Sequence, residues 1–331
     1  MRISVVGVGA TGARAARQLA TSDQVDRLLL ADADATVAGA AQRAIGERVD
    51  AVDPRQAMAE ADVTVLAVPS RVQPRLAAEA IRAGSDVVAL ADGLADVLVL
   101  LDLGREAAER GRTVLIGAGF APGLTCILAR HAAGWLDTVE EIHVAKLGTG
   151  GPSCAREHHD ALAGRTLDWR SGGWREQRGG SGRELSWFPE PVGGADCYRA
   201  ALPDPVLLHD AFPEADRITA RVAATRRDRI TARLPMLRRP HPEGLIGAVR
   251  VEVRGRIDGC YDTHVLGVLD RPAVAAGAVS AVAAIRQAHG QLGLPPGGHG
   301  LGGISDPTGF LHQLAERGVR AAAFGGTAVT A

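Results

Sequence analysis

The sequence predicts an α/β protein that has a doubly wound parallel Rossmann sheet and a second α+β domain built on a mainly antiparallel sheet. Six apolar runs alternate with helical segments up to residue 116, which is typical of a parallel sheet covered by helices. A Gly-x-Gly-x-x-Gly pattern follows the first run. Between residues 217 and 269 apolar and polar residues alternate instead, as in a strand with one wet face. This change of period marks the second domain.

The strongest signal is a dinucleotide-binding βαβ unit in the first fifty residues. An apolar run leads into Gly7, Gly9 and Gly12, a helical segment follows, and a second apolar run ends in Asp32. Gly7 permits a tight turn, Gly9 lets the backbone approach a pyrophosphate, and Gly12 lets the helix pack close to the sheet. Asp32, twenty residues after Gly12, is placed to bind ribose hydroxyls. The alternative is a βαβ unit that binds no ligand.

The remaining elements follow in order. Further strands are expected at 49–52, 63–68, 87–90 and 113–116, with helices at 54–60, 72–83 and 95–110. A glycine-rich turn then leads to a helix at 124–133, a strand at 139–147 and an irregular stretch rich in Gly, Arg and Trp at 150–200. The chain is expected to close with an antiparallel region at 217–269, a helix at 272–288, a glycine-rich loop at 290–303 and a helix at 307–318.

Composition narrows the classes of function. A net charge of −1 gives no electrostatic case for binding nucleic acid or an anionic membrane. No apolar stretch approaches the roughly 18 residues that a membrane span needs, and the chain starts directly in a strand, which predicts no signal peptide. The four cysteines are far apart and form no Cys-x-x-Cys pair. We therefore expect free thiols, a cytoplasmic protein and no metal site.

Lysine usage is unusual, because among 37 basic residues only Lys146 is a lysine. Arginine and lysine are not equivalent where an amine must lose or gain a proton. Lys146 is therefore a candidate for chemistry, and the alternative is a lysine kept by chance at a strand end.

Four segments, in this order along nearly the whole chain, resemble the saccharopine dehydrogenase-like family of NAD(P)-dependent oxidoreductases. They are the Gly7–Gly12 pattern, the turn Gly117–Leu124, the segment Trp187–Gly193 with Tyr198 close behind, and the closing stretch from Gly267 to Val319. The Glu-Lys-Pro signature of related sugar oxidoreductases is absent, since Val68-Pro69-Ser70 stands in its place. This departure argues against a sugar dehydrogenase.

The resemblance implies hydride transfer to or from the C–N bond of a small amino-acid-like substrate, such as an imine or an opine. It implies that the C-terminal helices return to the nucleotide domain, so that one domain covers residues 1–125 plus 268–331 and the substrate and dimerisation domain covers 126–267. It also implies a homodimer formed through the antiparallel sheet. Two alternatives stay open: a homoserine- or aspartate-type dehydrogenase that acts on a carbonyl, and a dinucleotide-binding sensor or scaffold without chemistry.

The cofactor site is expected at the carboxyl ends of the parallel strands, where ligands of open α/β sheets bind. The cofactor-binding residues expected there are Gly7, Gly9, Ala10, Thr11, Gly12, Asp32, Val68, Pro69, Ser70, Asp92, Gly119, Phe120 and Pro122. The Asp32 carboxylate, with Asp34 nearby and Arg43 as the next basic residue, would repel a 2′-phosphate. This favours NAD, and NADP is the alternative.

The chemistry also needs a proton donor, and the candidates are His158, His159, Lys146 and Tyr198. Imidazole titrates near neutral pH, which suits general acid catalysis. Neighbouring residues on a helix face about 100° apart, so at most one of the two histidines would point into a cleft. The alternative for both histidines is a packing or surface role.

A substrate carboxylate would need a cationic partner. The guanidinium group matches the planar fork of a carboxylate, which makes arginine the natural choice. The candidates in and beside the irregular stretch are Arg156, Arg170 and Arg199.

Overall fold

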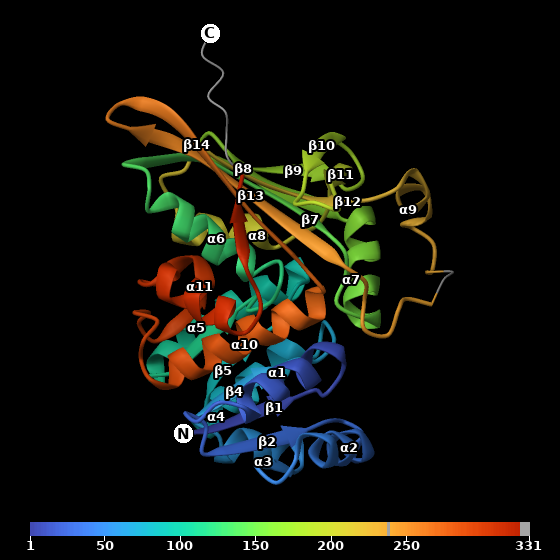
Figure 1. The fold of residues 1–331 in the computed structure, drawn as a ribbon, viewed down its shortest axis with the longest axis vertical. Helices are drawn as coiled ribbons and strands as arrows, with labels where there is room; N and C mark the ends of the chain where they lie inside the picture. Colours follow the sequence, from blue (N-terminus) through green and yellow to red (C-terminus); the bar gives the residue numbers. More distant parts are fainter. Residues whose placement is uncertain (237–238, 325–331) are drawn as a thin grey trace.

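The structure is a computed structural model that describes residues 1–236 and 239–324. It contains two sheets (Figure 1). A parallel sheet with its helices fills the lower half of the view, and a mainly antiparallel sheet crosses the top. Helices α6 (Leu124–Ala133) and α8 (Asp204–Ala211) lie between the two. The predicted fold class is confirmed.

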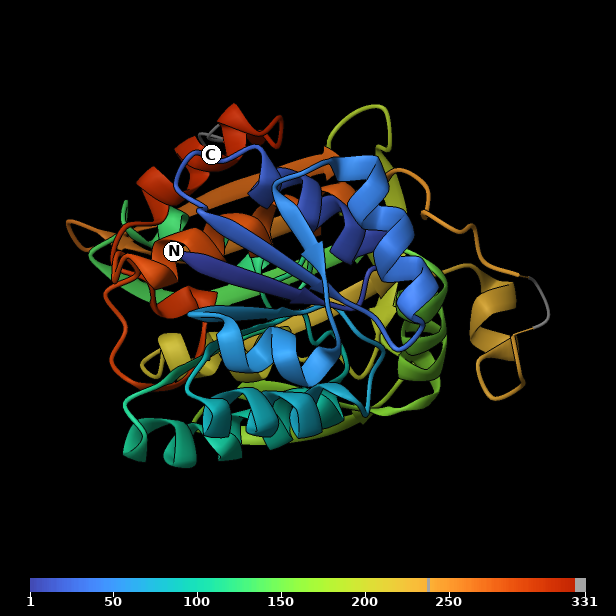
Figure 2. The ribbon, with the colours of Figure 1, turned by 90° about the horizontal axis from the view of Figure 1, so that it is seen from below.

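The parallel sheet has seven strands in the order β15-β6-β5-β4-β1-β2-β3. Its strands are β1 (Arg2–Val6), β2 (Arg27–Ala31), β3 (Val49–Ala51), β4 (Val63–Leu66), β5 (Asp86–Ala89), β6 (Thr113–Ile116) and β15 (Gly297–Gly300). All neighbouring pairs are parallel. The central strands are buried because helices cover both faces, as the view from below shows (Figure 2).

The helices of this half divide between the two faces of the sheet. On one face α1 packs against α10, and on the other α3, α4 and α5 contact one another in sequence. Helix α10 also packs on β4 and β5, so the C-terminal segment returns to the N-terminal sheet. The helices are α1 (Ala10–Ala20), α2 (Ala35–Ile45), α3 (Pro54–Glu60), α4 (Gln73–Ala83), α5 (Leu94–Glu109), α10 (Pro272–Ala288), the 3-10 turn Leu301–Gly303 and α11 (Pro307–Glu316).

The sequence does not predict the seventh strand, β15. Its residues are Gly-Gly-His-Gly, which the sequence assigns to a loop because glycine is depleted in strands. A Cβ on Gly104 of α5 would lie 2.6 Å from the backbone nitrogen of Gly298. The helix and this edge strand therefore approach backbone to backbone, and tertiary packing overrides the weak local propensity.

The second sheet has nine strands. Seven follow the order β10-β11-β12-β7-β13-β14-β16, and β8 pairs with β12 and β9. The strands are β7 (Thr138–Leu147), β8 (Arg165–Arg170), β9 (Gly173–Arg178), β10 (Glu184–Trp187), β11 (Gly194–Arg199), β12 (Arg217–Ala223), β13 (Gly247–Ile257), β14 (Cys260–Asp270) and β16 (Ala321–Ala323). All pairs are antiparallel except β12 with β7, which run parallel.

The expectation of an irregular stretch at 150–200 is wrong. This stretch contains α7 (Pro152–Ala163) and the four strands β8 to β11. Strands β9 and β10 are largely exposed, and the buried positions of β8 are the polar residues Thr166 and Asp168. These strands therefore lack the apolar alternation from which strands are predicted. Helix α9 (Arg226–Thr231) lies beside α7. Of the described helices, none is both long and apolar enough to cross a membrane.

Candidate functional site

A cavity of about 880 Å³ opens at the carboxyl ends of the parallel strands and extends under the second sheet. Its lining combines glycine and proline turns of the first half with β7 and α7 of the second. Of the predicted cofactor-binding residues, those that line it are Gly7, Gly9, Ala10, Thr11, Asp32, Val68, Pro69, Ser70, Asp92, Gly119, Phe120 and Pro122. The structure thus brings together segments that are far apart in the sequence.

The glycine turn between β1 and α1 lines the cavity. Gly7 has φ +92°, a conformation that side chains rarely adopt. A Cβ on Gly12 would lie 1.9 Å from the carbonyl oxygen of Gly7, so Gly12 seats the helix beneath the turn instead of lining the cavity. A Cβ on Gly9 would meet no described atom within 4 Å, which leaves this backbone open to a ligand.

Helix α1 begins at Ala10 with Gly9 as its N-cap, and no described side chain caps it. Its first N–H groups therefore remain available, and the helix dipole adds a partial positive charge at this point. Together with the open backbone of Gly9, this helix start fits a pyrophosphate.

Asp32 and Asp34 have different roles, although the sequence predicts that both lie near the cofactor ribose. Asp32 lines the cavity, and its carboxylate accepts N–H bonds from Val8 (2.7 Å) and from Asp34 (3.1 Å). These bonds hold the carboxylate in place while each oxygen keeps a further lone pair for a ribose hydroxyl. Asp34 instead caps α2, where its carboxylate accepts the N–H of Thr36 at 2.9 Å.

Two arginines that carry no signal in the sequence also line the cavity. Arg55 lies in the first turn of α3 and Arg75 in α4. Arg43 is the first basic residue after Asp32 in the sequence, but it is not among the described residues that line the cavity. Arg55 and Arg75 follow strand ends that neighbour β2 and β1 in the sheet, a signal that becomes visible only once the strand order is known.

Lys146 lines the cavity from near the end of β7. It is the largest fully buried side chain of the described chain, with 1% of its surface exposed. Its Nζ donates a hydrogen bond to the backbone carbonyl oxygen of Ala121 at 3.0 Å. This bond places the ammonium group against the turn that follows β6.

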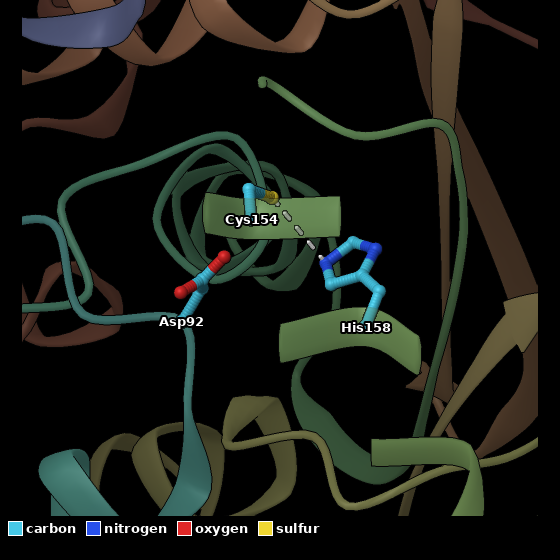
Figure 3. Close-up of side chains that lie close together, drawn as sticks. All are labelled: Asp92, Cys154 and His158. Atoms are coloured by element: carbon cyan, nitrogen blue, oxygen red, sulfur yellow. Dashed lines mark hydrogen bonds between the residues drawn. The ribbon is translucent and has the colours of Figure 1, made fainter. Parts of the chain in front are cut away.

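Asp92, Cys154 and His158 meet beside Lys146, and Figure 3 shows their side chains pointing toward one another. Asp92 follows β5, whereas Cys154 and His158 are four residues apart on one face of α7. Cys154 Sγ lies 3.7 Å from His158 Nε2, and the closest ligand atoms of all three side chains lie within 4.8 Å of one another. Cys154 carries no signal in the sequence that marks it as a site residue.

Burial dominates the electrostatics of this cluster. It raises the pKa of Asp92, against the opposing effects of the Lys146 ammonium and a hydrogen bond with the Cys154 thiol. It raises the pKa of Cys154 well above its ordinary value, and it lowers the pKa of His158 well below its ordinary value with help from Lys146. These shifts favour the neutral thiol of Cys154 and the neutral imidazole of His158 in the cluster without a ligand.

The other candidate proton donors lie elsewhere. His159 faces away from the cavity, as the helical geometry requires, and its Nε2 makes a hydrogen bond with the carbonyl of Leu234 at 2.9 Å. Tyr198 is buried on β11, and the Arg229 guanidinium stacks 4.1 Å from its ring centroid. Neither residue is among the described residues that line the cavity, so the structure does not bring His159 and Tyr198 together with Lys146 and His158.

Of the three candidate arginines, Arg156 lines the cavity from an exposed position on α7. Arg199 is engaged in an ion pair with Asp168, with an N···O distance of 3.2 Å. Arg170 ends β8, opposite Arg217 of β12. The structure therefore leaves Arg156 as the candidate for a substrate carboxylate and places the other two outside the cavity lining.

Comparison with known proteins agrees with this architecture. Residues 2–93 match the family model described as NADP oxidoreductase coenzyme F420-dependent. Saccharopine dehydrogenase (L-Glu forming) from Saccharomyces cerevisiae superposes with a TM-score of 0.70 at 16% identity, covering 98% of this chain and 100% of that one. The chain has the saccharopine dehydrogenase fold. DAP dehydrogenase from C. glutamicum, solved in complex with DAP, shares this fold less closely, with a TM-score of 0.52, 17% identity and 95% of each chain covered.

The residues that line the cavity come from two parts of the chain, one inside the family-model match and one beyond it. The part of the chain that matches the family model, up to residue 93, holds the glycine turn, Asp32, Arg55 and Arg75. The part beyond it supplies Lys146, Cys154 and His158. The residues capable of acid–base chemistry are thus contributed largely by the part of the chain that the family model does not cover.

Proposed function

We propose that the protein is an NAD(P)-dependent oxidoreductase that transfers a hydride to or from the C–N bond of a small amino-acid-like substrate. One observation carries the proposal: a single cavity joins an open, uncapped glycine turn with Asp32 to a buried lysine and its titratable neighbours. The names of the matched proteins support the same class of reaction. One neighbour forms L-Glu according to its name, and another was solved with DAP bound.

The residues of the first half would hold the dinucleotide. The turn at Gly9 and the start of α1 fit its pyrophosphate, Asp32 fits a ribose, and the turns Val68–Ser70 and Gly119–Pro122 flank the end that faces Lys146. When bound, the nicotinamide dinucleotide supplies or accepts the hydride.

We assign the proton transfer to Lys146. Its ammonium is buried, is fixed by Ala121 and faces the cavity, so it can deliver a proton to the substrate nitrogen on reduction and take one back on oxidation. Arg156, at the exposed edge of the same cavity, would bind the substrate carboxylate.

We favour NAD as the cofactor because the fixed Asp32 carboxylate would repel a 2′-phosphate. Arg55 and Arg75 favour NADP instead, since each could pair with its 2′-phosphate. We also propose that the protein forms a homodimer through its antiparallel sheet. A cytoplasmic location is proposed because its four cysteines are free and unsuited to a disulfide framework.

Binding and turnover, measured separately, test the proposal. A change in the fluorescence of NADH or NADPH on addition of the purified protein reports binding. A loss of absorbance of the reduced cofactor, in the presence of a panel of 2-oxo acids combined with amines, reports turnover. If the protein binds neither NADH nor NADPH, the proposal is overturned. Turnover of an aldehyde such as aspartate semialdehyde, but of no amine mixture, would favour the carbonyl dehydrogenase, and binding without turnover on either panel would favour a sensor.

A further inference from the structure

The cluster formed by Asp92, Cys154 and His158 presents three different metal-ligating groups at one point. We propose that these three side chains form a binding site for a divalent transition metal ion of the Zn²⁺ type. The sequence predicts no metal site because the cysteines show no ligand spacing. The fold brings Asp92, in the loop after β5, close to Cys154 and His158 on α7. The inference does not depend on the proposed function, since it concerns the ligand atoms alone.

The distance between the two helix ligands matches tetrahedral coordination. Zn–S and Zn–N bonds of about 2.3 and 2.0–2.1 Å at a tetrahedral angle place the sulfur and the nitrogen about 3.6 Å apart. Cys154 Sγ and His158 Nε2 lie 3.7 Å apart. Their spacing of four residues sets both on one helix face, the spacing at which paired histidines bind zinc on a helix.

Asp92 closes the site from the opposite wall. Its carboxylate oxygen lies within 4.8 Å of both helix ligands, whereas a bound ion requires about 3.4–3.6 Å. The difference amounts to a shift of at most about 1.4 Å, which is within the range of a side-chain rotation. Figure 3 shows the carboxyl group already turned toward the thiol and the imidazole.

The nature and charge of the ligands favour zinc or cobalt. Thiolate and imidazole are ligands that Zn²⁺ prefers, whereas Mg²⁺ and Ca²⁺ require oxygen ligands. One thiolate and one carboxylate balance the two charges of the ion, so a bound ion adds no net charge beside Lys146. Lys146 does not compete for the site, because its Nζ is engaged by the Ala121 carbonyl.

Three protein ligands leave one tetrahedral position open, as in catalytic zinc sites. All three residues line the same cavity as Lys146. The open position is therefore available to an oxygen or nitrogen atom of a molecule bound in the cavity, which fits a ligand that carries a carbonyl or amine group.

Cobalt binding tests the site without reference to activity. The full-length protein is freed of metal with a chelator, reduced with a non-chelating phosphine and titrated with Co²⁺ in a Cys260→Ser background, because Cys260 is exposed. We expect saturation at one ion per chain, a thiolate-to-cobalt charge-transfer band, and displacement of the cobalt by Zn²⁺ but not by Mg²⁺.

Ligand variants locate the ion. Cys154→Ser should abolish the charge-transfer band, and His158→Asn and Asp92→Asn should each weaken binding by more than about 100-fold, since even outer partners of metal ligands contribute 10–100-fold. His159→Asn, on the same helix but directed at Leu234, should bind cobalt normally. Far-UV circular dichroism of each variant checks that the protein is folded, and dinucleotide fluorescence reports failure of the proposed function separately.

Two results would overturn the metal site. One is the lack of saturable cobalt uptake by protein that is folded and reduced. The other is a charge-transfer band that persists in Cys154→Ser, or an affinity that is equal in His158→Asn and His159→Asn.

Discussion

Lys146 Nζ donates a hydrogen bond to the backbone carbonyl oxygen of Ala121 at 3.0 Å. This bond connects β7 of the antiparallel sheet to the turn that follows β6 of the parallel sheet. The lysine is buried, yet it lines the cavity. The link therefore fixes the one lysine of the chain at the boundary between the two halves of the candidate site.

Replacement of Lys146 should remove turnover and spare cofactor binding. Loss of a positioned proton donor typically costs 10²–10⁴-fold in rate. We expect Lys146→Met to lower kcat by roughly this factor and to leave the Kd for the dinucleotide unchanged, measured by stopped-flow absorbance and fluorescence titration. Lys146→Arg keeps the charge but cannot release a proton at neutral pH. Full activity in Lys146→Arg would show that charge alone suffices.

Asp32 should determine the choice of cofactor. Its carboxylate is held by the N–H groups of Val8 and Asp34, and a serine at this position would no longer repel a 2′-phosphate. We expect Asp32→Ser to shift the ratio of kcat/KM for NAD over NADP by roughly 10- to 100-fold toward NADP, the range of one hydrogen bond to a charged group. Asp34→Ser is the matched control because serine also caps helices. An equal shift in both variants would refute the assignment.

Arg55 should provide the residual affinity for NADP. It lines the same cavity as Asp32, and a guanidinium–phosphate pair is a strong charge-assisted hydrogen bond. We expect Arg55→Ala to weaken NADP binding by about tenfold or more and to leave NAD binding unchanged, as measured by calorimetry. Arg43→Ala should change neither affinity. Equal losses for NAD and NADP in Arg55→Ala would place the arginine at the adenine or the pyrophosphate instead.

His143 should make stability depend on pH. Burial lowers the pKa of His143, although Glu141 opposes the shift; Thr219, Glu252 and Arg254 complete its surroundings. Below about pH 6.5 this histidine is therefore protonated in the unfolded chain but still neutral in the folded protein. The free energy of unfolding consequently falls as the pH drops toward the pKa of the folded state.

The measurement is the free energy of unfolding in urea between about pH 7 and pH 5, the window set by this direction of shift. We expect His143→Gln to lose less stability over this range than the unaltered protein. His312→Gln, an exposed position, should follow the unaltered protein. Parallel pH profiles for all three proteins would contradict the assignment.

The cofactor half of the site could be predicted from the sequence because its signals are local. Each of Gly7, Gly9 and Asp32 follows an apolar strand at a fixed spacing, and parallel strands bring their carboxyl ends together. Cys154 carries no such signal, because its meeting with Asp92 depends on how α7 packs against the loop after β5. Tyr198 is close in sequence to a glycine turn, but the pairing of β11 with β12 directs it under Arg229.

The edge strand β15 gives a test of packing, since its contact with α5 depends on glycine. A Cβ on Gly104 would lie 2.6 Å from Gly298 N, so Gly104→Ala must displace α5 or β15. We expect a loss of about 1–3 kcal/mol in the free energy of unfolding, the usual cost of overpacking. Gly39→Ala is the matched control: its Cβ would meet only Arg43 Nη1, at 3.5 Å, inside helix α2.

Gly39→Ala should stabilise the protein by about 0.5–1 kcal/mol, the general difference between alanine and glycine within a helix. Urea unfolding of both variants measures the two effects with opposite signs. Equal stabilisation by both substitutions would mean that α5 and β15 do not approach as closely as the structure places them. The seventh strand would then be held by its pairing with β6 alone.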